Sequence, residues 1–130
     1  MNRTHNPSAI APPFNNRYSH AVETVEEARH LFISGQIGVK PDGSIDADVE
    51  GQSEQIMENL REILASAGMG FADLVKINAY LLNAEDIPKF AAIRARHLDG
   101  GRPAMTTVVV TALAAPQWLI EVEAVAAKRG

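Results

Sequence analysis

The segment that decides the fold is Asp73–Leu82, which reads DLVKINAYLL. Side chains of an extended chain alternate between two faces, and here every second residue is apolar. The residues of that face are Val75, Ile77, Ala79 and Leu81, and those of the other are Leu74, Lys76, Asn78, Tyr80 and Leu82. Both faces are partly apolar, which predicts a strand.

Helical spacing of apolar residues is found on both sides of this strand. Before it, Asp46 or Asp48 can cap a helix that Gly68 ends. After it, Asp86 can cap a second helix, with proline in its first turn, that Gly100-Gly101 ends. The positions expected to face inward are Val49, Ile56, Leu60, Ile63, Leu64 and Ala67 in the first helix and Ile87, Phe90, Ile93 or Arg94, and Leu98 in the second.

Four further segments have the composition of strands. Tyr18–Val25 and Arg29–Val39 precede the first helix, and the turn residues Pro41-Asp42-Gly43-Ser44 follow them. Met105–Leu113 and Trp118–Ala126 follow the second helix, separated by a short Ala-Ala-Pro segment. We expect these last two strands to close the sheet as a hairpin.

The order of these elements predicts one α+β domain over residues 1–130, with a mixed sheet, two helices on one face and an irregular leader at residues 1–16. The helices would leave the other face of the sheet bare, and such a face is normally buried against another subunit. This favours a homo-oligomer. In the alternative, the short strands curl and the leader covers the bare side.

Composition excludes several classes of function. The formal net charge is −4, which repels nucleic acid and anionic lipid. The chain has no cysteine, so disulfides and thiolate chemistry are excluded. No apolar run approaches the length of a membrane span or a signal sequence. We therefore expect a cytoplasmic protein with no nucleic-acid or membrane partner.

No motif for a metal or nucleotide is found. The 4 histidines lack metal-ligand spacing, no glycine-rich loop is followed by lysine, and no serine lies in a nucleophile elbow. We expect neither a metal nor an organic cofactor.

Two acids of the last strand are the strongest candidates for chemistry. Alternation places Glu121 and Glu123 on one face with Leu119 and Val125. A carboxylate on a partly apolar surface reaches solvent, pairs with a cation or is kept protonated by desolvation, and the last two produce catalytic acids. An edge strand with two solvated glutamates is the alternative.

Short motifs extend in order from Tyr18 to Ala126. They are Tyr18-Ser19-His20-Ala21-Val22, Ser34-Gly35-Gln36-Ile37, Pro41-Asp42-Gly43, Asn59 with Ile63-Leu64-Ala65-Ser66-Ala67-Gly68, Val75-Lys76, Pro103-Ala104 and Ile120–Ala126. Together they resemble the RidA/YjgF family. The resemblance implies a chorismate-mutase-like (YjgF-like) two-layer fold and a homotrimer with a small-molecule cleft at each subunit seam. It also implies enamine/imine deaminase activity, which yields 2-keto acids and ammonia without a metal or cofactor.

The family's site residues map onto this chain with one clear departure. By resemblance, Glu121 matches the water-activating glutamate, Tyr18 the cleft tyrosine and Ser34-Gly35 the cleft-lining turn. The deaminases have an arginine after Pro-Ala that clamps the substrate carboxylate, but Met105 occupies that position. Arg17 lies beside Tyr18, and its side chain could turn toward the cleft or away from it.

Other residues could compensate for the missing clamp. Met105 cannot bind a carboxylate, so it either fills an apolar seam or selects a bulkier or less anionic ligand. Arg94 stands where the family has an asparagine, and Arg102 lies three residues before Met105; each could supply a cation or be a solvated charge. Thr106 and Thr107 offer hydroxyls to a ligand, although threonine is also common in strands.

Three functions therefore remain open. The first is an imine or enamine deaminase that uses Glu121. The second is a trimer that binds a small metabolite without turning it over. The third is an endoribonuclease or translation inhibitor, which the negative charge and the scarcity of aromatic residues disfavour.

Overall fold

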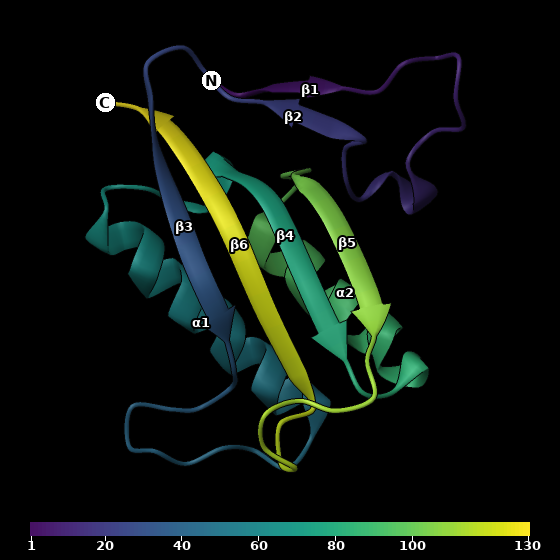
Figure 1. The fold of residues 1–130 in the computed structure, drawn as a ribbon, viewed down its shortest axis with the longest axis vertical. Coiled ribbons are helices and arrows are strands. Elements are labelled where there is room, and N and C mark those ends of the chain that lie inside the picture. The colour runs from purple at the N-terminus through teal and green to yellow at the C-terminus, as the bar shows by residue number, and fades with distance from the viewer.

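A computed structural model describes residues 1–130 and contains a mixed four-stranded sheet in the order β3-β6-β4-β5 (Figure 1). The strands are β3 (Ala28–Gln36), β4 (Leu74–Leu81), β5 (Ala104–Val109) and β6 (Ile120–Arg129). β6 pairs antiparallel with β3 and β4, whereas β5 pairs parallel with β4. Helix α1 (Val49–Ser66) and helix α2 (Ile87–Leu98) both lie behind the sheet in Figure 1, as the α+β prediction requires.

The expected hairpin between the last two strands is wrong, because β4 lies between them. β4, α2 and β5 form a strand–helix–strand unit, which is the usual way to connect parallel neighbours. Residues 110–119 then carry the chain past β4 to the centre of the sheet. There Ile120 and Val122 are fully buried, whereas Val109 at the β5 edge is 46% exposed.

The ends of α1 follow the sequence signals, and the start of α2 does not. Asp48 accepts a hydrogen bond from the Gly51 N–H at 3.3 Å. At the other end Gly68 has φ of +71°, a conformation that glycine adopts without strain. Asp86 does not cap α2; its carboxylate instead pairs with Lys89 at 3.3 Å.

The core lies between the helices and the sheet. The largest of its side chains are fully or almost fully buried, and they come from α1, α2, β4 and β6: Ile56, Met57, Leu60, Leu64, Ile77, Leu81, Phe90, Ile120 and Val122. Gln52 of α1 is a polar side chain that is fully buried among them. Its amide nitrogen donates to the carbonyl oxygens of Asp46 (2.9 Å) and Gln117 (3.0 Å), and its oxygen accepts from Leu119 N at 2.9 Å. Gln52 therefore joins the loop before α1 to the loop before β6.

The amino-terminal segment contains more regular structure than the irregular leader we expected. β1 (Arg3–His5) pairs antiparallel with β2 (Ala21–Glu23), and a short 3-10 helix spans Phe14–Asn16. Two further 3-10 helices span Phe71–Asp73 and Ala84–Asp86. None of the helices has the length and apolar character needed to cross a membrane.

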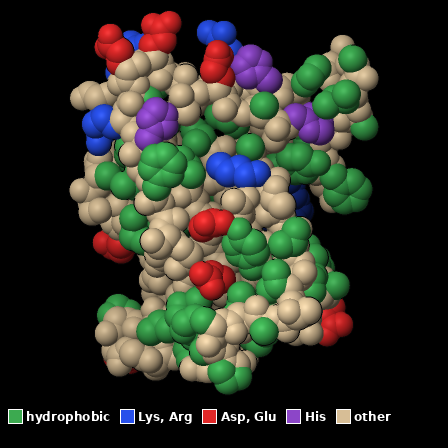
Figure 2. Space-filling view, viewed as in Figure 1, with side chains coloured by type: hydrophobic (Ala, Val, Ile, Leu, Met, Phe, Trp, Pro, Cys, Tyr) green, Lys and Arg blue, Asp and Glu red, His purple; other side chains and the backbone are tan.

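The helices leave the other face of the four-stranded sheet open, and the β1–β2 pair lies beyond the end of the sheet instead of over this face (Figure 1). We call this surface the open face. It is less apolar than predicted, since acidic and basic side chains lie in its middle with apolar ones around them (Figure 2). The residues that project from it include Phe32, Lys76, Asn78, Tyr80, Val108, Glu121, Glu123 and Val125.

Candidate functional site

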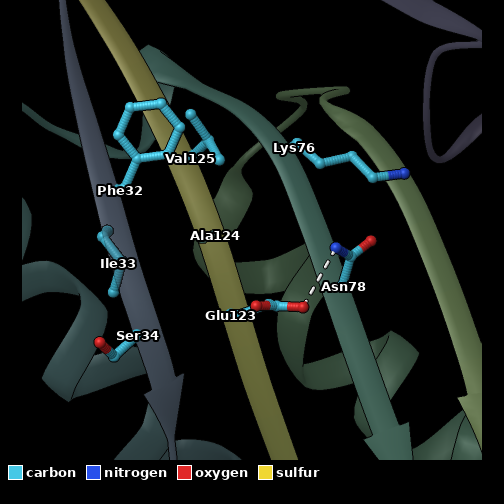
Figure 3. A pocket seen from close by; sticks show the side chains of 8 residues that line it. All are labelled: Phe32, Ile33, Ser34, Lys76, Asn78, Glu123, Ala124 and Val125. Atoms are coloured by element: carbon cyan, nitrogen blue, oxygen red, sulfur yellow. Dashed lines mark hydrogen bonds between the residues drawn. The ribbon is translucent and has the colours of Figure 1, made fainter.

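The two candidate acids lie in the middle of the open face, each opposite a polar residue of β4. Glu121 is paired in register with Tyr80, and Glu123 with Asn78. The Tyr80 hydroxyl donates a short hydrogen bond to Glu123, and the Asn78 amide donates to the same oxygen at 3.4 Å (Figure 3). The hydrogen bond from Tyr80 to Glu123, together with burial and the negative charges of Glu123 and Glu121, raises the pKa of Tyr80 above its ordinary value.

A small pocket of about 280 Å³ opens beside Glu123; we call it the sheet-face pocket. Ser34, Phe32 and Lys76 also line it (Figure 3). The Lys76 ammonium donates one hydrogen bond to the Thr106 hydroxyl at 3.0 Å and has no acidic partner. The pocket therefore presents the Glu123 carboxylate, the Ser34 hydroxyl and the Asn78 amide, with the Lys76 ammonium at its margin and bonded to Thr106.

Glu121 is held against the turn that the sequence singled out. The pairing of β3 with β6 is interrupted between Ile33 and Gln36, so Ser34 and Gly35 form a bulge. A Cβ atom added to Gly35 would overlap the Glu121 carboxylate. Only glycine leaves the room that this carboxylate occupies, so Gly35 and Glu121 form one local unit.

A larger cavity of about 560 Å³ lies at the β5 edge, on the helix side of the sheet. We call it the Arg94 cavity. Its lining comes from β5, α2 and the segment before β2, and comprises Phe14, Asn15, Arg17, Tyr18, Ile87, Pro88, Ala91, Ala92, Arg94, Met105 and Thr107. The lining contains no carboxylate.

Hydrogen bonds of Ser19 bring Tyr18 to this cavity. Ser19 is almost completely buried, its N–H donates to the Pro103 carbonyl at 3.1 Å, and its hydroxyl donates to the Arg102 carbonyl at 2.5 Å. The chain before β2 therefore runs along the start of β5. As a result Tyr18 lies close to Met105 although 87 positions separate them in sequence.

Arg94 is the most unusual residue of the cavity. It is only 7% exposed, yet its guanidinium has no hydrogen-bond or ion-pair partner in the protein. Its Cζ atom lies over the ring of Phe90, 5.3 Å from the ring centroid, in a cation–π contact. Ser53 Oγ is the only side-chain nitrogen or oxygen atom that is both inaccessible to solvent and without a hydrogen-bond partner. Since the Arg94 nitrogens also lack a partner, they must be accessible, and they reach the cavity.

Electrostatics at Arg94 favour an anion. Burial holds the pKa of its guanidinium below the ordinary value, and the positive charge of Arg17 lowers it further. An arginine nevertheless stays protonated at neutral pH. A buried cation without a partner is unfavourable, and a carboxylate in the cavity would relieve this.

The structure divides the sequence-predicted site residues between two places. Those in the Arg94 cavity are Tyr18, Arg94, Met105 and Thr107. Those on the open face are Ser34, Gly35, Thr106 and Glu121. Arg102 belongs to neither group and is exposed. Successive residues of β5 point to opposite faces of the sheet, so Met105 lines the cavity and Thr106 lies on the open face. The alternation of side chains along a strand could have predicted this from the sequence.

Sequence reasoning missed three neighbours of these residues. Asn78 and Tyr80 contact Glu123 across the sheet, and Phe14 lines the Arg94 cavity from the leader. The partners of Glu123 depend on the register of β4 against β6, which no local motif encodes. Phe14 carried a weak signal, as an aromatic residue in a polar segment.

Comparison with known proteins identifies the family. The model of the family described as Endoribonuclease L-PSP matches residues 8–128. The chain belongs to this family, the RidA/YjgF family. A mouse protein of this family, named 2-iminobutanoate/2-iminopropanoate deaminase, is 32% identical over 97% of this chain and 88% of its own length. A RutC family protein of Pyrococcus horikoshii is 33% identical over 94% of this chain and 91% of its own length.

Solved structures of RidA/YjgF proteins share the fold. The Rid family protein YyfB from Yersinia pestis superimposes with a TM-score of 0.87 at 34% identity, covering 96% of this chain and 97% of the other. RidA from an Antarctic Psychrobacter superimposes with a TM-score of 0.71 at 30% identity, covering 93% of this chain and 92% of the other. The expected YjgF-like fold is therefore confirmed.

Proposed function

We propose that this RidA/YjgF protein is a deaminase of small 2-imino acids in which Arg94 holds the substrate carboxylate. The observation that carries the proposal is the buried, unpartnered guanidinium of Arg94 in the cavity that also contains Tyr18 and Met105. An arginine binds a carboxylate through two parallel hydrogen bonds. Arg94 would thus do from α2 what the family's arginine does from position 105.

The reaction that fits this site is hydrolysis of a C=N bond. Water adds to the imine carbon, ammonia leaves, and a 2-keto acid remains. A carboxylate that accepts a proton from the water and returns it to the leaving nitrogen accelerates both steps. Glu121 is the candidate for this role, since Gly35 leaves the space for its carboxylate at a bulge.

Glu121 and Arg94 of one protomer cannot act on the same small molecule, because they lie on opposite sides of the sheet. We propose that the site is completed in a homotrimer, where the open face of one protomer meets the β5 edge of the next. Exposed Phe32 and Val108 support burial of that face against another copy. Sedimentation equilibrium tests the assembly: three times the 14.0 kDa chain mass is expected, and a stable monomer would contradict it.

The activity is tested by generating 2-iminopropionate with an amino-acid oxidase and following its decay. We expect the wild-type protein to accelerate decay, and Arg94→Gln or Glu121→Gln to reduce the acceleration about 100-fold or more. Arg102→Gln removes an exposed cation outside the cavity and is the matched control. Unchanged decay with wild-type protein that still binds pyruvate through Arg94 would indicate the non-catalytic binding protein instead.

A further inference from the structure

Two guanidinium groups, not one, belong to the Arg94 cavity. Arg17 lines it together with Arg94, and neither forms an ion pair or a side-chain hydrogen bond with the rest of the chain. By contrast, Arg3, Arg61 and Arg96 each have an acidic partner. The cavity therefore concentrates positive charge in a protein whose net charge is −4.

The two arginines occupy different depths. Arg94 is buried at the inner end, whereas Arg17 is exposed and belongs to the segment that brings Tyr18 to the cavity. They are close enough for the charge of Arg17 to act on Arg94. A ligand held by its first carboxylate at Arg94 would thus extend outward toward Arg17.

Apolar residues make up much of the remaining lining of the cavity. Met105, Ile87 and Ala91 contribute hydrocarbon surface, which suits a short methylene chain. The volume of about 560 Å³ falls within the range of pockets that hold ligands much larger than a three-carbon acid. The cavity thus has room for a longer acid with charges at both ends.

We propose that the ligands of this cavity are dicarboxylic 2-imino acids and the matching 2-oxo dicarboxylates. This inference rests on the proposed function and specifies its substrate class. Arg94 holds the carboxylate next to the C=N carbon, and Arg17 holds the terminal carboxylate. The terminal group is a spectator, so the bonds formed and broken are those of the hydrolysis above.

The test compares two stable five-carbon acids that differ in one charge. Calorimetric titration of the full-length protein at fixed ionic strength measures the affinity for 2-oxoglutarate and for 2-oxopentanoate. Since one charge-assisted contact is at stake, we expect 2-oxoglutarate to bind about tenfold more tightly, or better. The net charge of −4 repels a dianion more than a monoanion, so the net charge of the whole molecule does not produce this preference.

Two variants distinguish the role of Arg17 from a general effect of charge. Arg17→Gln should abolish the preference by weakening 2-oxoglutarate binding while leaving 2-oxopentanoate unchanged. Arg102→Gln removes another exposed cation, outside the cavity, and should leave both affinities unchanged. The imines of glutamate and of norvaline, generated by amino-acid oxidases, should show the same preference in kcat/KM.

The outcomes separate this inference from the proposed function. If both acids bind equally well through Arg94, or if the preference survives in Arg17→Gln, the dicarboxylate inference is overturned and the carboxylate site remains. If neither acid binds, or if binding does not depend on Arg94, both are overturned.

Discussion

Replacement of Arg94 by methionine should make the ligand-free protein more stable. Methionine replaces the aliphatic stem of the arginine with an unbranched apolar chain and removes the buried charge. An ion buried without a partner destabilises a fold by several kcal/mol. Two features of the structure reduce this amount: the guanidinium still reaches the cavity, and it lies over the ring of Phe90, a contact worth about 1 kcal/mol.

The net change expected for Arg94→Met is a gain of about 1 kcal/mol in the free energy of unfolding. For a chain of 130 residues this corresponds to a rise in Tm of about 3–5 °C. Urea denaturation at one fixed protomer concentration measures the change, since assembly makes stability depend on concentration. The exposed Arg96, which pairs with Glu54, is the control, and Arg96→Met should change stability by less than about 1 kcal/mol.

The same variant should lose the stabilisation that a ligand provides. A 2-oxo acid at a hundred times its Kd stabilises the wild-type protein by about 2.7 kcal/mol, and this increment should vanish in Arg94→Met. A large loss of stability without ligand would show that the charge of Arg94 is already compensated within the protein. Undiminished protection by the ligand would show that the carboxylate binds elsewhere. Either result would show that Arg94 is not an unpaired cation that binds the ligand.

Three further predictions concern the open face and the core. Gly35→Ala should displace the Glu121 carboxylate, destabilise the fold by about 1–3 kcal/mol and reduce imine hydrolysis, as measured by denaturation and by the oxidase-coupled assay. The raised pKa of Tyr80 means that its contribution to stability is complete below pH 10 and is lost as the pH rises through the folded-state value; Glu123→Gln should move the phenol's absorbance titration to lower pH. Gln52→Leu breaks its hydrogen bonds to three backbone groups and should destabilise the protein by about 3 kcal/mol in urea denaturation.

Each of these changes has a matched control. Gly70→Ala introduces a methyl group into open space and should be nearly neutral. Tyr18→Phe leaves Tyr80 as the only phenol in the chain, so its titration can be followed alone. Gln55→Leu removes a half-buried amide that bonds only Asn59, and a loss as large as that of Gln52→Leu would contradict the bridging role.

Local signals were sufficient for most of the secondary structure. Helical spacing identified Val49, Ile56, Leu60 and Leu64 as buried positions of α1 but missed Gln52, Ser53 and Met57. Asp48, one of the two candidate caps, and the stop at Gly68 mark its ends. The order of the strands was beyond these signals. β5 is a short edge strand, and its composition does not distinguish pairing with β6 from pairing with β4.

The candidate site shows the same limit. Strand alternation correctly grouped Glu121 with Glu123, but it did not reveal that Tyr80 lies across from them. The neighbourhood of Arg94 depends on Ser19, which brings a segment far away in sequence to the start of β5. Contacts between distant segments follow from the whole fold, so single motifs could nominate Arg94 but could not show that it lacks a partner.

The most direct test is a crystal structure of the protein with a bound 2-oxo acid. We expect the carboxylate next to the oxo group to lie within hydrogen-bond distance of the Arg94 guanidinium, inside the cavity lined by Tyr18 and Met105. An acid bound in the sheet-face pocket beside Glu123, with Arg94 still unpartnered, would contradict the account.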